Sequence, residues 1–218
     1  MTHILTMMRA GQLANVEIAS IAATELGVEH LTRMADALPP KLQFAQEANR
    51  ISVFASGWND VDWSQRIATL RRLLAIFCAM PPGTATLTWL FSGRILEHRC
   101  AADLMARWDA AQAPPVIDLI GFSAHQETGA RRIMSLGLAA IVGHEIEALV
   151  EGTVPELARM VGRLAQLALE TGPLVTANAI GPDGQPYRLE RHDRTPARAA
   201  MIRIIMICKS KMDSSPLA

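Results

Sequence analysis

The spacing of apolar residues along the chain predicts a mixture of helices and strands. Over residues 10–48 apolar side chains recur at every third or fourth position, the period of a helix that packs on one side. Later segments alternate apolar and polar residues or are apolar throughout, which indicates strands. Helices are predicted over 10–48, in two or three pieces, and over 63–80, 98–112 and 153–171, and strands over 51–55, 84–91, 94–96, 116–122, 174–180, 187–192 and 201–208. This order predicts an α+β (or α/β) fold, a layered sandwich of helices on a mixed sheet with a helical N-terminal extension.

Residues 128–150 are the stretch around which the rest of the chain can be arranged. They predict a short apolar helix that ends at Gly143, followed by a strand. Alternation along that strand places His144 on one face and both Glu145 and Glu147 on the other. The two carboxylates therefore point the same way, and either they face water or other groups pair with them.

Two helix starts carry a local capping signal. Asp62 is followed three residues later by Gln65, and Thr153 by Glu156, which is the spacing of a capping box. The expected organisation is a helical N-terminal extension over 1–48, an α+β domain over 49–208 and a flexible tail over 209–218. Half of the 218 residues are apolar, which is enough to build a sizeable core.

The charge balance and the cysteine content argue against several classes of protein. The chain has 21 basic and 21 acidic residues, so its net charge of zero predicts no general attraction to nucleic acid or to an anionic membrane. The three cysteines form no CxxC pair, which favours reduced thiols over a disulfide framework. Neither a secretory signal nor a membrane-spanning run is expected, so the prediction is a cytoplasmic protein. Without a glycine-rich phosphate loop, no cofactor is predicted.

Two partial catalytic patterns are present. His144-Glu145 begins like a metalloprotease helix, but the second histidine is missing and the segment is predicted to be a strand, so no metal site is expected. Ser123 lies in Gly-Phe-Ser-Ala-His, which resembles a nucleophile elbow in which His125 replaces the second glycine. The order Ser123, Asp183, His192 would match a serine hydrolase, although three common residue types in that order are easily found by chance.

The stretch Ser135-Leu136-Gly137-Leu138, followed by Gly143 to Glu147, resembles the core motif of the bacterial domain of unknown function 4261 (DUF4261) family. The likeness extends over about residues 50–208. It departs from the family's pattern at Ser135, where the family has threonine directly before the Gly-Leu pair, and the N-terminal segment has no counterpart. The resemblance implies a fold and no activity. If the motif carries a shared site, its residues are Gly137, Gly143, Glu145 and Glu147, with His144 beside them.

The function predicted from these observations is a protein-interaction or accessory module without catalysis, such as an immunity protein, that acts on a protein partner or forms its own dimer. The alternative is an enzyme in which Glu145 and Glu147 share acid and base roles, with His144 or Arg94 beside them. A serine hydrolase using Ser123 is the less favoured second alternative. Nucleic acid is not an expected partner, and the sequence does not identify a small-molecule partner.

Overall fold

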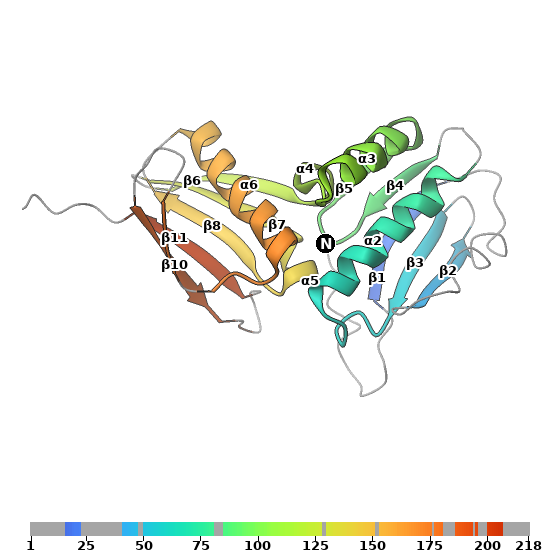
Figure 1. Ribbon diagram of the computed structural model, residues 1–218, viewed down its shortest axis with the longest axis horizontal. Coiled ribbons are helices and arrows are strands. Elements are labelled where there is room, and N and C mark those ends of the chain that lie inside the picture. Colours follow the sequence, from blue (N-terminus) through green and yellow to red (C-terminus); the bar gives the residue numbers. More distant parts are fainter. Residues whose placement is uncertain are drawn as a thin grey trace, which may run out of the picture.

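The chain folds into two lobes, each built on its own sheet, and the predicted α+β class is confirmed (Figure 1). The computed structural model describes residues 16–22, 41–47, 50–80, 85–127, 130–150, 153–175, 177–180, 186–193, 195 and 200–206. We call the lobe with β1 to β5 the first lobe and the lobe with β6 to β11 the second lobe.

Within the described ranges, the first lobe is a five-stranded antiparallel sheet with two helices. Its strands lie in the order β2-β3-β1-β4-β5. They are β1 (Val16–Ala22), β2 (Lys41–Glu47), β3 (Arg50–Ser56), β4 (Thr86–Trp89) and β5 (Arg94–Glu97), and the helices are α2 (Trp63–Cys78) and α3 (His98–Ala111). The two helices pack against each other, and one face of α2, including Leu70, Leu74 and Phe77, is fully buried in the core.

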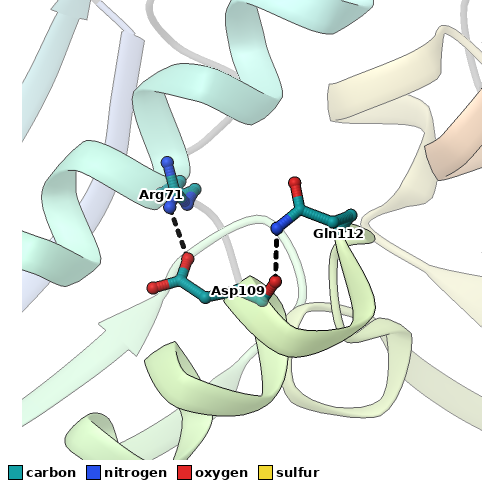
Figure 2. A network of polar contacts seen from close by, with 3 residues as sticks. All are labelled: Arg71, Asp109 and Gln112. Atoms are coloured by element: carbon teal, nitrogen blue, oxygen red, sulfur yellow. Dashed lines mark hydrogen bonds and ion pairs between the residues drawn. The ribbon is translucent and has the colours of Figure 1, made fainter.

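A polar contact joins the two helices of the first lobe at their surface (Figure 2). Arg71 of α2 forms an ion pair with the carboxylate of Asp109 on α3. The carbonyl of Asp109 accepts a hydrogen bond from the side chain of Gln112, the left-handed residue that ends α3. Both partners of the ion pair are about half exposed, so this contact contributes little to stability.

The second lobe is a six-stranded mixed sheet with one long helix. The strand order is β6-β7-β8-β11-β10-β9, and only the β8–β11 pair is parallel. The elements are α4 (Val116–Leu119), β6 (Gly121–Glu127), β7 (Ala130–Leu136), α5 (Leu138–Val142), β8 (Glu145–Val150), α6 (Val154–Thr171), β9 (Ala177–Ile180), β10 (Pro186–His192) and β11 (Met201–Met206). Helix α6 packs on β7 and β8, and α5 lies where the two lobes meet (Figure 1).

The N-terminal extension was predicted to be helical, and this is wrong for the parts that the structure describes. Val16–Ala22 is β1, the central strand of the first sheet, and Lys41–Glu47 is β2. A bulge between Glu17 and Ala19 breaks the alternation of β1, so Ile18 and Ile21 are buried three residues apart, which is a helical spacing. These two strands are thus integral parts of the first lobe. The predicted domain over 49–208 holds the rest of that lobe and all strands of the second lobe, and the predicted tail lies outside the described residues.

Two further segments differ from their predicted structure. Residues 116–122 were predicted to be a strand, but Val116–Leu119 is a short helix after Pro115, and β6 begins only at Gly121. A short apolar run fits a buried helical turn as well as a strand. The predicted helix before Gly143 is reduced to Leu138–Val142, because Ala130–Leu136 pairs with strands on both sides.

The local helix starts are confirmed. Asp62 and Gln65 form a complete capping box at α2, and Thr153 and Glu156 form another at α6. The strand after Gly143 is confirmed as β8. Both capping signals depend only on residues three positions apart, which explains why the sequence predicts them correctly.

Candidate functional site

The five candidate residues, Gly137, Gly143, His144, Glu145 and Glu147, lie together around helix α5 and the start of β8. Gly137 and Gly143 flank α5 and both have left-handed backbones, with φ of +93° and +89°. We call the segment 137–145, including α5, the joint, because it also contacts the first lobe. The contacts of each candidate residue show what it does there.

Glu145 caps the N-terminal end of α5. Its Oε1 accepts the backbone N–H groups of Gly137 at 2.8 Å and Ala139 at 3.1 Å. Its Oε2 accepts the hydroxyl of Ser135 at 2.5 Å, and that hydroxyl oxygen in turn accepts the N–H of Ile146 at 2.8 Å. Burial raises the pKa of Glu145, and the hydrogen bonds from Ser135, Ala139 and Gly137 oppose this rise. The carboxylate thus has three donors from its own chain and replaces the missing side-chain cap of α5.

The first lobe caps the opposite end of α5. The indole N–H of Trp58 donates to the carbonyl of Ala140 at 2.9 Å, and Arg66 donates to the carbonyl of Ile141 at 3.0 Å. Arg66 also donates to the backbone carbonyl of Trp58 at 2.9 Å, and its guanidinium carbon lies 5.9 Å from the centroid of the Trp58 ring. Carbonyls at a helix end lack partners within the helix. Side chains from far upstream in the sequence therefore join the lobes at these carbonyls.

The two glycines of the motif have different surroundings. A Cβ atom added to Gly137 would lie 2.8 Å from the carbonyl oxygen of Phe91, which belongs to the first lobe. A Cβ added to Gly143 would meet no atom of the described residues within 4 Å, apart from its chain neighbours. Gly137 is therefore required both by its backbone angle and by the close approach of the lobes, whereas Gly143 is required by its backbone angle alone.

His144 is buried and has a structural partner. Its Nε2 lies 2.9 Å from the backbone N of Leu174 and accepts that N–H, so the ring proton is on Nδ1, which faces the carbonyl of Glu145 at 3.3 Å. Burial lowers the pKa of His144, and the positive charge of Arg191 acts in the same direction. The lowered pKa favours the neutral imidazole, and the ring is held by the backbone N–H of Leu174.

Glu147 is completely buried between two arginines of the neighbouring strands. Its Oε2 accepts the Nε–H of Arg203 at 2.8 Å, and its Oε1 forms an ion pair with Nε of Arg132 at 3.1 Å. The side chains of Arg132 and Arg203 are 23% and 28% exposed, while that of Glu147 is 0% exposed. The sequence left open whether the two carboxylates face water or are paired with other groups, and the structure shows that they are paired. Each carboxylate has its own partners, and the two do not form a shared acid–base pair.

Ser123 does not lie on a nucleophile elbow. It is the third residue of β6 and pairs with Met134 of β7. His192 lies on β10, four strand spacings away in the sheet order, which is roughly 19 Å at about 4.8 Å per strand. Asp183 lies outside the described residues. The hydroxyl oxygen of Ser123 is enclosed and has no hydrogen-bond partner among the described residues.

The feature that the sequence reasoning missed is the open edge formed by β6. This strand has seven residues, and within the described part of the chain it pairs on one side only, with β7. The side chains of Ala124, His125 and Gln126 are exposed, and Phe122 is 36% exposed. The sequence signal was present: the segment Gly121–Glu127 contains no proline, lysine or arginine. It was missed because the segment was interpreted as the end of a strand followed by a loop.

Comparisons with known proteins give no family for this chain. No family model matches it, and searches of curated proteins and of solved structures return no significant match. The likeness to the DUF4261 family therefore stays a prediction based on the motif. In the part of the chain that the structure describes, none of the helices is long and apolar enough to cross a membrane. Among those same residues, histidine, cysteine and acidic side chains form no group of three or more that could hold a metal ion.

Proposed function

We propose that this protein is an interaction module that binds a protein partner by pairing a strand of that partner with the open edge of β6. The observation that carries the proposal is the seven-residue strand Gly121–Glu127, which among the described residues has a neighbouring strand on one side only. Its side chains at Phe122, Ala124, His125 and Gln126 are exposed. An unpaired strand edge presents a row of N–H and C=O groups to which an extended segment can add.

The register of the β6–β7 hairpin indicates which backbone groups are available. The ladder ends at the pair Glu127 and Ala130, with two residues between them. In a hairpin of that length the pair next to the loop exchanges both backbone hydrogen bonds, and every second pair does the same. We infer that Phe122, Ala124 and Gln126 direct their N–H and C=O groups outward, where a partner strand can reach them.

The other sheet edges are shorter or carry more charge. Edge strands β5 and β9 have four residues each, and β5 begins and ends with the charged residues Arg94 and Glu97. Edge strand β2 has seven residues and begins with Lys41 and ends with Glu47. Edge strands are protected from pairing by short length, charged side chains and proline. By these criteria β6, whose single charged residue is Glu127 at its end, is the least protected edge.

The candidate acids support a binding role over the alternative of catalysis. Glu145 is held by three hydrogen bonds at the end of α5, and Glu147 is held by two arginines. A general acid or base must reach a substrate proton, and both carboxylates are already held by groups of their own chain. We place the interaction in the cytoplasm, where thiols such as Cys78 and Cys100, both free in the structure, stay reduced.

Site-specific photo-crosslinking tests the proposal. A p-benzoylphenylalanine at position 124, introduced into the protein in cells of its source organism, is expected to give a discrete protein adduct on illumination. The matched control carries the same group at position 102, because Ala102 is also exposed but lies on α3 of the first lobe. The proposal is contradicted if position 124 gives no adduct, or if both positions give the same set of adducts.

A further inference from the structure

We propose that the strand that pairs with β6 is β6 of a second copy of this chain, in an antiparallel arrangement centred on Ala124. This inference rests on the proposed function, since it identifies the partner of the same edge. The result is a symmetric dimer in which the second-lobe sheets of the two copies form one continuous sheet. The argument comes from the side-chain pattern of β6 itself.

The twofold arrangement fixes the register. Side chains that face each other across an antiparallel pair lie on the same face of the sheet, so a strand that pairs with its own copy must have a residue at the twofold axis. Of the possible centres, Ala124 is the middle of Gly121–Glu127 and is the one that leaves no residue of β6 unpaired. Ala124 is also one of the residues that direct their backbone groups outward, so the central pair can exchange both hydrogen bonds. Its small, exposed side chain places no obstacle at the axis.

In this register the side chains that face each other across the two copies are compatible. Phe122 lies opposite Gln126 of the second copy, and Ser123 lies opposite His125 of the second copy. The single charged residue, Glu127, lies opposite Gly121, so no two like charges face each other across the pair. Because the whole chain has a formal net charge of zero, repulsion between copies is also weak.

The enclosed hydroxyl of Ser123 is an independent reason for the same register. Its oxygen has no hydrogen-bond partner among the described residues, and a buried hydroxyl without a partner is uncommon. His125 lies on the same face of the sheet as Ser123, two positions along the strand, and its side chain is exposed. In the dimer each Ser123 faces a His125 ring across the axis, and rotation of the serine side chain about χ1 directs its hydroxyl to that ring. Two such pairs form for every dimer.

A charge-swap experiment tests the dimer and its register together. Light scattering coupled to size exclusion is expected to give twice the chain mass for the wild-type protein. Ala124→Lys and Ala124→Glu are each expected to give a single-chain mass, because each places two like charges opposite each other at the axis. An equimolar mixture of the two variants is expected to recover the doubled mass, since lysine then faces glutamate. Ala102→Lys, on the surface of the first lobe, is the control and is expected to keep the wild-type mass, and circular dichroism checks that every variant is folded.

The outcomes separate this inference from the proposed function. A wild-type protein that stays at single-chain mass overturns the second copy as partner, and so does a dimer that Ala124→Lys leaves intact. Loss of the dimer in both variants without recovery in the mixture overturns the register centred on Ala124. If the crosslinker at position 124 then captures a different protein, the edge is still a binding site and only its occupant has changed. If position 124 captures nothing, the proposed function fails as well.

Discussion

The carboxylate oxygen Oε1 of Glu145 lies 2.8 Å from the backbone nitrogen of Gly137, eight residues earlier, and accepts its N–H. This contact links the two ends of the joint, because a side chain from β8, the strand after α5, binds the backbone at the start of α5. The far end of α5 is bonded to Trp58 and Arg66 of the first lobe. The joint thus has a structural role in this chain, as the connection between the two lobes.

Removal of the Glu145 carboxylate is expected to destabilise the protein. Glu145→Ala leaves the N–H groups of Gly137 and Ala139 without their acceptor, which costs about 1–3 kcal/mol for each buried group that water cannot reach. Glu145→Gln keeps an acceptor oxygen and is expected to lose less. Urea unfolding of the two variants and the wild type measures the difference. Equal losses for alanine and glutamine would contradict the capping role.

The raised pKa of Glu145 predicts a particular pH dependence of stability. Its pKa in the unfolded chain is near the ordinary value of 4.5 and its folded pKa is higher, so the folded state holds the proton more tightly. The contribution of this group is therefore fully present below about pH 4.5 and is lost as the pH rises through the folded pKa. The difference in unfolding free energy between the wild type and Glu145→Gln, followed from pH 4 to 8, isolates it. If this free-energy difference does not change with pH, the pKa of Glu145 is the same in the folded and unfolded states, and the predicted shift is wrong.

His144 is expected to show the opposite sign. Burial lowers its pKa below the ordinary value of 6.5, so its contribution to stability is present above pH 6.5 and is lost as the pH falls through the folded pKa. His144→Gln offers an acceptor for the N–H of Leu174 and does not titrate. Compared with this variant, the wild type is predicted to lose stability as the pH falls below 6.5. NMR titration of the ring gives the pKa directly, and a value above 6.5 would refute the assignment.

The two glycines of the joint form a matched pair of substitutions. Gly143→Ala has room for its Cβ and is expected to cost only the strain of a left-handed backbone, about 1–3 kcal/mol. Gly137→Ala has the same strain and also forces Phe91 of the first lobe away, so its loss is expected to be larger by about 1–3 kcal/mol. Thermal and denaturant unfolding compare the two variants. If both variants lose the same free energy of unfolding, Phe91 can move aside without an energetic penalty and the lobes are not tightly packed at Gly137.

The sequence predicted those features that depend on neighbouring residues. The capping boxes at Asp62 and Thr153, the helices α2, α3 and α6, and the strand after Gly143 follow from local spacing. Strand β1 was missed because its bulge gives Ile18 and Ile21 a helical spacing. Strand β7 was missed because its pairing with β6 and β8 determines its conformation, and pairing involves residues that the local pattern does not include.

The position of the candidate residues at the start of β8 could be predicted from the sequence, but their roles could not. Alternation puts His144 on the face opposite Glu145 and Glu147, and this stays a prediction. The partners of Glu147 are Arg132 and Arg203, 15 and 56 residues away in the sequence, and only the sheet order brings them together. The open edge of β6 also depends on the sheet order, because a strand lies at an edge only when no other strand pairs with its second side.

Backbone pairing at the β6 edge is the central claim, and amide hydrogen exchange on the unaltered protein tests it most directly. The complex of the protein with its partner, whichever chain that is, is compared with the isolated single chain at single-residue resolution. The N–H groups of Phe122, Ala124 and Gln126 are predicted to exchange rapidly in the isolated chain and to become protected in the complex. If these three amides exchange at the same rate in both states, no strand adds to β6, and the account of this edge as the binding site is wrong.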